Sequence, residues 1–257
     1  MSVALRSTHT SFLKRAAVAA AATMACAGAW AADDLPDFTF NGFVADNINI
    51  SDYSVVNFTG PSTFQTSGLL GVTNFQHNGT VVTADGGLNE TYGLYFSFSG
   101  DGSITNVGGG NSFGSYSNLT FSLYAYNGAG ATYGVTAAGA TKSATTDTLL
   151  ATGTLVDGGV ATVNGVPSAN ASLSFALTAA GQSYFTSPSP FYNLAYSAFT
   201  NTLSTVTQTG TGFTISNGGG AVNFATAVPE PETYAMIFAG LGALGFLARR
   251  RSGGNNS

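Results

Sequence analysis

The feature that most constrains the fold of this chain is a series of turn-forming dipeptides that recurs through its middle. Five are Asn-Gly pairs, which supply the positive φ angles that tight β-hairpins require: Asn41-Gly42, Asn78-Gly79, Asn127-Gly128, Asn164-Gly165 and Asn217-Gly218. Three Asp-Gly pairs add further turn candidates: Asp85-Gly86, Asp101-Gly102 and Asp157-Gly158. Because short segments remain between these turns, the middle of the chain is predicted to form antiparallel β-structure.

The segments between the turns alternate apolar and polar residues with a period of two. The clearest apolar positions are Leu119, Phe121, Leu123 and Ala125, and then Leu173, Phe175 and Leu177. Similar strands are expected over residues 53–58, 93–98, 149–156, 213–216 and 221–225. A strand with one polar face belongs to a sheet that is solvated on one side, so two such sheets are expected to pack together. We therefore predict an all-β fold, an antiparallel, jelly-roll-like β-sandwich, with Phe121, Leu123, Leu173 and Phe175 facing its interior.

Charged residues are scarce and unevenly distributed. The chain has 7 Lys and Arg and 12 Asp and Glu among 257 residues. Between residues 33 and 227 a single cation, Lys142, accompanies ten acids, so this segment has a formal net charge of −9. It lacks the basic surface that binds phosphate, which excludes a nucleic-acid partner. Serine and threonine supply 50 of these 195 residues, and a surface solvated by hydroxyls suits a hydrated sugar matrix.

The first 31 residues have the pattern of a secretory signal peptide. Arg6, Lys14 and Arg15 precede an apolar run over residues 16–25 that is too short to span a bilayer. The small residues Ala29 and Ala31 form an A-x-A site, so cleavage is expected before Ala32. An uncleaved anchor and a lipoprotein cut before Cys26 are the alternatives. Cleavage at Ala32 removes the only cysteine and leaves a mature domain over residues 32–227 without thiol chemistry.

The other end of the chain, residues 228–251, combines three features. Pro229-Glu230-Pro231 comes first, an apolar run over residues 234–248 follows, and Arg249-Arg250-Arg251 ends the segment before a polar tail over residues 252–257. The apolar run is predicted to be a transmembrane helix of marginal length, with the arginines snorkelling to the interface. Their charge should stay on the cytoplasmic side, which places the preceding domain outside.

This three-part tail resembles the PEP-CTERM sorting signal of exported proteins in Gram-negative bacteria that make extracellular polysaccharide. The resemblance implies processing by exosortase, a membrane peptidase that cuts near Pro229-Glu230-Pro231 and discards the helix. It also implies that the inner membrane is a transient partner, held through the C-terminal helix before the domain reaches the cell surface or matrix. An ordinary C-terminal anchor that happens to follow this tripeptide is the alternative.

The middle of the chain is similar to flocculation-associated PEP-CTERM proteins, a family implicated in cell aggregation within exopolysaccharide. The landmarks of this resemblance are Phe43-Val44-Ala45-Asp46, Tyr53, Phe58, residues 91–95, Tyr184-Phe185, Pro190-Phe191-Tyr192 and residues 222–225. It implies a role in floc or biofilm formation and extracellular polysaccharide as a partner.

The sequence offers little for catalysis or metal binding. His77 is the only histidine after residue 31 and lies beside a predicted turn; pairing it with Asp85 in a Ser–His–Asp arrangement is the enzymatic alternative. Asp46 and Asp52 lie in a stretch rich in oxygen ligands whose spacing does not match a calcium loop, and Asp46 is expected to cap a strand or turn instead. Asp37 is interpreted as part of a solvated acidic start. We therefore expect no catalytic residue, no metal and no cofactor.

Four tyrosines are candidates for stacking on sugar rings. Tyr124 and Tyr126 fall on the polar face of their predicted strand, and Tyr192 and Tyr196 share parity on another. Aromatic rings on a neutral sheet face can stack on sugars while their hydroxyls form hydrogen bonds; the alternative is that these rings cover a sheet edge or pack beneath a loop.

The function predicted from these features is that of a non-catalytic surface or matrix protein acting in flocculation or biofilm. The protein is expected to be exported through the Sec pathway, tethered to the inner membrane as a precursor and sorted by exosortase. A carbohydrate-binding module with a specific glycan site is the first alternative, and a secreted glycan-active enzyme is the second.

Replacing Pro229-Glu230-Pro231 with three alanines should block the processing of the tail. Proline lacks a backbone N–H and disfavours helix at the residue before it, so the tripeptide keeps the segment extended and accessible to a peptidase. We expect an uncut, membrane-retained protein, detected by mass spectrometry of the membrane fraction. Trimming of this variant to wild-type mass would show that the tail is a simple anchor.

Overall fold

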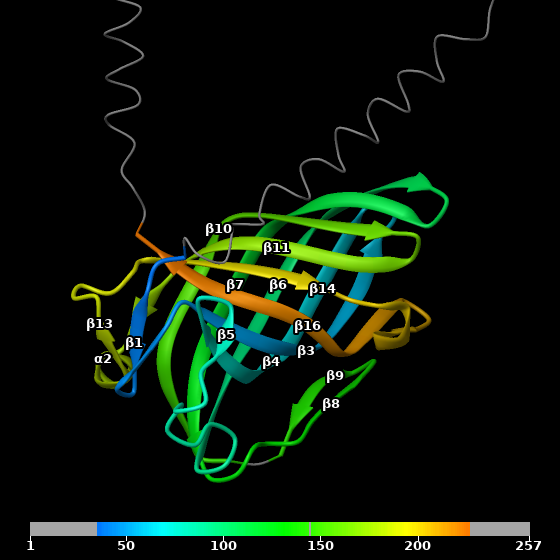
Figure 1. Ribbon diagram of the computed structural model, residues 1–257. Helices are drawn as coiled ribbons and strands as arrows, with labels where there is room; N and C mark the ends of the chain where they lie inside the picture. The colour runs from blue at the N-terminus through cyan, green and yellow to red at the C-terminus, as the bar shows by residue number, and fades with distance from the viewer. Residues whose placement is uncertain (1–34, 144, 227–257) are drawn as a thin grey trace, which may run out of the picture. The chain divides into compact units, whose positions relative to one another are not determined.

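The computed structural model describes residues 35–143 and 145–226, and these are almost entirely β-structure (Figure 1). Eight antiparallel strands form one closed barrel. In chain order they are β3 (Asn47–Gly60), β4 (Thr63–His77), β6 (Tyr92–Gly108), β7 (Asn111–Asn127), β10 (Asp147–Val163), β11 (Val166–Ser174), β14 (Leu194–Thr200) and β16 (Gly212–Ala225). Each strand pairs with the next one along the chain, and β16 returns to pair with β3.

The predicted sandwich of two sheets is therefore wrong, because the sheet has no open edge at which it divides. The decisive pairing is β10 with β11, in register from Leu155↔Leu173 to Val163↔Val166, which continues the sheet from β7 into β14. A period of two shows that each strand has an inner and an outer face. It does not show whether the inner faces belong to two packed sheets or to one sheet closed on itself.

Bulges and glycines let these long strands curve into a barrel. The register shifts between Asn49 and Ile50 in β3 and between Ser216 and Gly218 in β16. Gly102 lies on the inner face of β6, where an added Cβ would come within 2.6 Å of the ring of Phe64. Small residues and bulges at such points permit the bending that closure requires.

The turn predictions are confirmed at several Asn-Gly pairs. Asn41, Asn78 and Asn164 have positive φ angles of 46°, 50° and 52°. They form the turns that join β1 (Phe38–Phe40) to β2 (Phe43–Ala45), β4 to β5 (Thr80–Val81) and β10 to β11. Asn217 also has a positive φ, of 62°, but it lies at the bulge inside β16 rather than between two strands.

A separate small layer closes one end of the barrel. It consists of a three-stranded sheet in the order β13-β1-β2, where β13 spans Phe185–Ser187, and the helix α2 (Ala179–Tyr184). Thr178 caps this helix by accepting a hydrogen bond from the Gly181 backbone N–H at 3.0 Å. The layer inserts aromatic rings into the barrel end, and together with rings from the barrel they form what we call the plug cluster: Phe38, Phe40, Phe75, Phe175, Phe185, Phe191 and Phe224.

The remaining elements lie around the barrel. The hairpin of β8 (Tyr133–Thr136) and β9 (Gly139–Lys142) contacts the outside of β3 and β4, where Tyr133 stacks on Tyr53 with ring centroids 5.3 Å apart (Figure 1). The short elements are β12 (Ala176–Leu177), β15 (Val206–Gln208) and the 3-10 helix η2 (Leu203–Thr205). None of the helices in the described part of the chain is long and apolar enough to cross a membrane.

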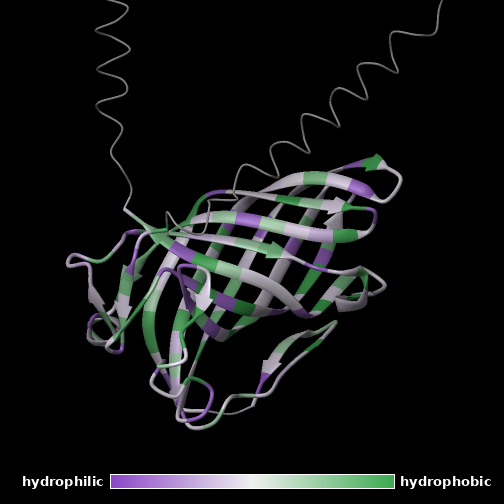
Figure 2. Cartoon of the chain, viewed as in Figure 1, coloured by the Kyte–Doolittle hydropathy of each residue, from purple (hydrophilic) through white to green (hydrophobic). Residues whose placement is uncertain are grey.

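The apolar positions of the alternating pattern face the barrel interior, as predicted. Phe121, Leu123, Leu173 and Phe175 are all buried, and Leu123 is fully enclosed. Figure 2 shows the alternation as hydrophobic and polar bands along each strand. The predicted signal peptide, the transmembrane helix over residues 234–248 and the sorting tripeptide lie outside the described residues.

Replacing Phe175 with alanine should strongly destabilise the domain. The ring is 4% exposed and packs on Phe224 and Phe121, so its loss should lower the free energy of unfolding by about 3–5 kcal/mol. Tyr196→Ala is the matched control, because that ring is 40% exposed on β14 and should cost about 1 kcal/mol or less. Urea denaturation followed by circular dichroism measures both; equal losses would contradict the packing described.

Candidate functional site

The barrel interior is only partly filled by side chains. The plug cluster occupies one end, and a cavity of about 100 Å³ extends from its neighbourhood toward the β3–β4 and β10–β11 hairpins. Its walls are mainly aromatic and aliphatic, with Phe64, Phe98, Leu119 and Ile215 among them. Such a lining disfavours sugars and ions and favours apolar molecules.

One carboxyl group interrupts this apolar lining. Asp52 points inward from β3, is 4% exposed, and its Oδ1 has no hydrogen-bond partner among the described residues. Burial raises the pKa of Asp52 to about 7, although a hydrogen bond with Ser54 acts in the opposite direction. A buried carboxylate with one unpartnered oxygen is costly, so this side chain is the most unusual feature of the cavity lining.

A second unpartnered oxygen lies near Asp52. Asn201 donates from Nδ2 to the Pro167 carbonyl at 3.0 Å, which orients its Oδ1 toward Gly218 with no donor for it. Gly218 is also the residue that pairs with Asp52 across β3 and β16. Both oxygens therefore belong to the same part of the cavity wall, and both are hydrogen-bond acceptors.

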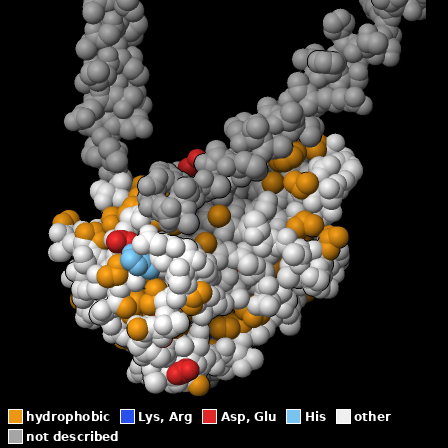
Figure 3. All heavy atoms as spheres, in the orientation of Figure 1, with side chains coloured by type: hydrophobic (Ala, Val, Ile, Leu, Met, Phe, Trp, Pro, Cys, Tyr) orange, Lys and Arg blue, Asp and Glu red, His pale blue; other side chains and the backbone are white. Residues whose placement is uncertain are grey.

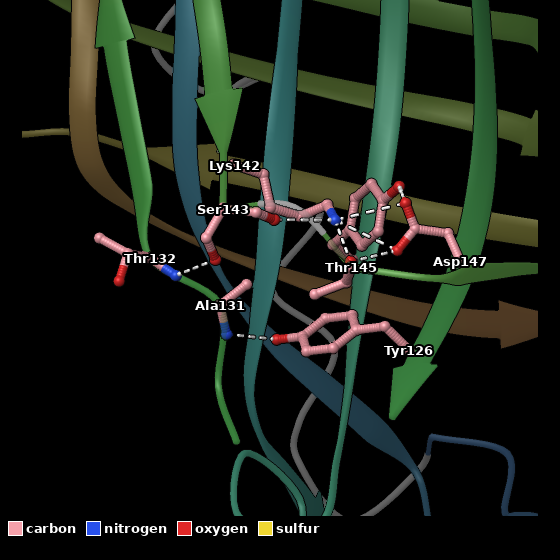
Figure 4. A network of polar contacts seen from close by, with 8 residues as sticks. Tyr126, Ala131, Thr132, Lys142, Ser143, Thr145 and Asp147 are labelled. Carbon is pink, nitrogen blue, oxygen red and sulfur yellow. Dashed lines mark hydrogen bonds and ion pairs between the residues drawn. The ribbon is translucent and has the colours of Figure 1, made fainter. Parts of the chain in front are cut away.

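The single cation of the described residues lies outside the barrel and is already engaged. Lys142 Nζ is 3.1 Å from Asp147 Oδ1 and lies over the rings of Tyr95 and Tyr126, at 4.8 and 5.4 Å from their centroids (Figure 4). Burial raises the pKa of Asp147, but hydrogen bonds from Thr145, Lys142 and Tyr95 outweigh it and leave the pKa below its usual value. This network pins the β9 end against β6, β7 and β10 and leaves Lys142 little capacity to bind an anion.

The structure places the four tyrosines selected for sugar stacking in different environments. Tyr124 stacks on Tyr95 at 5.1 Å, whereas Tyr126 is 2% exposed and accepts a hydrogen bond from the Ala131 N–H at 2.8 Å (Figure 4). Tyr192 packs on the plug cluster and donates to the Asp37 carbonyl. Tyr196 lies exposed on β14, which β10 and β11 separate from β7. The four rings do not form one platform.

The outer face of β3, β4, β6 and β7 carries a polar groove that the sequence did not reveal. It encloses about 340 Å³ and is lined by Asn57, Gln65, Ser99, Asp101 and Asn118, among others. Strand pairing assembles the groove, because Gln65 pairs with Asp101 and Asp101 with Asn118, although they are far apart in the chain. Only the strand register brings these side chains side by side.

A row of hydroxyl groups runs from this groove across the outer face of the barrel. Ser67, Ser99, Thr120 and Thr154 are cross-strand neighbours on β4, β6, β7 and β10. The row continues to β11, where the Ser174 hydroxyl lies 3.1 Å from that of Thr154. In Figure 3 the visible face is mostly neutral, with scattered hydrophobic side chains and few acids.

Three potential metal-ligating side chains meet at the plugged end. His77 Nε2 lies 3.2 Å from Asp37 Oδ1, and one ligand atom from each of Asp37, Asp46 and His77 lies within 4.8 Å of the others. Asp46 is buried and accepts a hydrogen bond from the Asn78 backbone N–H, which confirms that it caps a turn. Asp85, the imagined catalytic partner of His77, instead accepts hydrogen bonds from the Gly87 and Leu88 N–H groups.

The comparison with protein families gives one match. Residues 227–251 match the family described as the PEP-CTERM protein-sorting motif, which confirms the resemblance of the tail. No curated protein and no solved structure matches the chain. The fold and the motif therefore define an exported β-barrel protein. The motif indicates that exosortase processes it and that it is sorted to the cell surface or the extracellular space.

Replacing Asp52 with asparagine should change how the stability of the barrel depends on pH. Burial raises the pKa of this carboxyl to about 7 in the folded state, against 3.8 for an ordinary aspartate. The unfolded chain therefore loses the proton first, and the wild-type free energy of unfolding should fall between about pH 4 and pH 7 by on the order of 4 kcal/mol.

Asp52→Asn cannot ionise, so its stability should lack that fall and exceed that of the wild type at pH 8. Asp101→Asn, on the outer face, is the matched control and should retain the fall. Urea denaturation at pH 4, 6 and 8 measures the three proteins. Parallel pH profiles for wild type and Asp52→Asn would contradict a desolvated carboxyl at this position.

Proposed function

We propose that this is a non-catalytic surface or matrix protein that associates with extracellular polysaccharide in flocculation or biofilm formation. Export through the Sec pathway with a cleaved signal peptide, and transient tethering to the inner membrane, belong to the same proposal. The observation that carries it is the polar outer face, rich in amides and hydroxyls, on which the polar groove and the hydroxyl row lie next to each other.

The chemistry of this face fits sugar hydroxyls. The amides of Asn57, Gln65 and Asn118 offer both donors and acceptors. The hydroxyls of Ser99 and Thr120 also donate and accept, and these shorter side chains lose less conformational entropy on binding. A polymer can exchange its hydrogen bonds to water for bonds to these groups along its length. Each exchange gains little, about 0.5–1.5 kcal/mol, so useful affinity comes from many repeats of a long polymer.

The charge distribution favours a neutral polysaccharide, or an anionic one that divalent cations bridge to the domain. The single cation between residues 33 and 227 is Lys142, and Asp147 already neutralises it. An anionic polymer would meet a domain with a net charge of −9 and no free cation among the described residues. Repulsion of this kind weakens binding at low salt.

Binding to the neutral exopolysaccharide of the producing cells should depend on the groove and be insensitive to salt. Asn118→Ala should weaken binding about 3- to 10-fold, because one amide loses its hydrogen bonds. Thr186→Val, an exposed change on β13 away from the groove, is the control. Co-sedimentation at 0.05 and 0.5 M NaCl measures both variants. Binding that drops steeply with salt in the absence of divalent ions would contradict this proposal.

The cellular role has its own test. Deletion of the gene should disperse flocs, and complementation with the wild-type chain should restore them, whereas the alanine variant of residues 229–231 should not. Unchanged floc formation in the deletion strain would overturn the flocculation role without affecting the sorting assignment.

A carbohydrate-binding module with a specific glycan site is the second candidate. The exposed ring of Tyr196 on β14 and the ring of Tyr124 on β7 favour it. A glycan array distinguishes the two functions, because a specific site would select one glycan and lose it in Tyr196→Ala or Tyr124→Ala. General association with a polymer would show neither selectivity nor dependence on a single ring.

A further inference from the structure

The interior cavity has an imbalance of hydrogen-bonding groups that the proposed function does not use. Asp52 Oδ1 and Asn201 Oδ1 are buried acceptors without donors, and both line the cavity. The large majority of buried side-chain polar atoms have a hydrogen-bond partner, so two unpartnered acceptors in one cavity wall require an explanation. Both oxygens lack a hydrogen-bond donor. This points to a ligand that carries N–H or O–H groups and no competing acceptor.

The titratable residues that line the cavity indicate which kind of donor group a ligand would carry. Asp52 and Tyr116 are the titratable side chains among the described residues of the lining, and neither is a cation. The negative charge of Asp52 raises the pKa of the Tyr116 phenol beyond the rise that burial causes, so this phenol stays neutral. An ammonium group has three donors, no acceptor and the opposite charge, which matches a carboxylate beside an amide oxygen.

We propose that the barrel cavity binds a small apolar amine, with its ammonium group held between Asp52 and Asn201 and its hydrocarbon part against the surrounding aromatic and aliphatic side chains. Phe64, Phe98 and Ile215 supply that apolar wall. The ligand class is distinct from the polysaccharide proposed for the outer face, because the inner lining offers few partners for sugar hydroxyls.

The size of the cavity limits the ligand. Its volume is about 100 Å³, smaller than an engineered apolar cavity of about 150 Å³ that accepts benzene. A primary amine with about four carbon atoms fits this space. Longer chains would have to extend out of the cavity between the hairpins.

A route for such a ligand lies at the end of the barrel opposite the plug cluster. Phe58 lines the cavity and is nevertheless 42% exposed, so the cavity reaches the surface beside this ring. Val163 at the β10–β11 turn and Leu203 in η2 are also exposed, at 48% and 67%. Val163 follows the cavity residue Thr162 in the chain, and Leu203 lies close in the chain to the cavity residue Asn201. An apolar rim of this kind favours entry of an apolar molecule.

The binding should strengthen as pH rises, which distinguishes an ammonium from a neutral donor. An alkyl ammonium stays charged from pH 6 to pH 8, and Asp52 changes from mainly protonated to mainly ionised over this range because its pKa is about 7. Tyr116 from β7 is the other titratable group facing the site and does not ionise there. The affinity for an amine should therefore rise up to about tenfold from pH 6 to pH 8.

The test compares n-butylamine, n-butanol and butyrate on the full chain in lipid nanodiscs, with empty nanodiscs subtracted. Ligand-observed NMR gives the dissociation constants at pH 6 and pH 8. We expect butylamine to bind at least tenfold more tightly than butanol at pH 8, and butyrate not to bind. Asp52→Asn should abolish the preference for the amine and its pH dependence. Asn201→Ala should weaken amine binding about threefold at both pH values.

Asp101→Asn is the matched control and should bind butylamine like the wild type, because Asp101 lies in the outer groove. Circular dichroism confirms that each variant is folded before binding is measured. The proposal is overturned if butylamine binds no better than butanol, if Asp52→Asn binds it as tightly as the wild type, or if none of the probes binds. These outcomes leave the polysaccharide measurements unaffected, since the two sites lie on opposite faces of the sheet.

Discussion

The structure depends on one continuous ring of backbone hydrogen bonds. Eight strands pair with their chain neighbours, and the pairings of β10 with β11 and of β16 with β3 leave no strand of the barrel unpaired on either side. An open sheet with strands of 14 to 17 residues, as β3, β6 and β10 are, would expose long edges that other chains could extend. Closure removes that hazard in a protein without a disulfide in its predicted mature form and with few charges to keep copies apart.

Closure also creates an interior that must be filled or left partly open. At one end β1 supplies Phe38 and Phe40, and β13 supplies Phe185. Phe38 and Phe185 pack edge to face on Phe224, and Phe40 stacks on Phe75. At the other end the wall is also mainly aromatic and aliphatic, but a cavity of about 100 Å³ remains. The same sheet therefore encloses a closely packed end that supports the fold and an end whose free volume and unpartnered acceptors are available to a ligand.

The outer surface follows from a different constraint. With one cation and a net charge of −9 between residues 33 and 227, the barrel is solvated mainly by hydroxyl and amide groups. On the outside of the barrel, the ion pair between Lys142 and Asp147 holds the β8–β9 hairpin against the strands rather than facing a partner. Sorting to the surface by the tail and an exterior of hydroxyl and amide groups are consistent with the matrix role proposed above.

The sequence by itself determined the local structure and the address of the protein. Asn78-Gly79 and Asn164-Gly165 predicted turns because few residues other than Asn and Gly adopt positive φ, and the alternation around Phe121 predicted which side chains are inside. The tail was recognisable because a short linear motif acts without a fold. Only the tertiary structure decided that the sheet closes, because closure depends on pairing between strands whose edges are alike in sequence. It also decided that Asp52 and Asn201, 149 positions apart, line one cavity, since no local pattern records which inward-facing residues share a space.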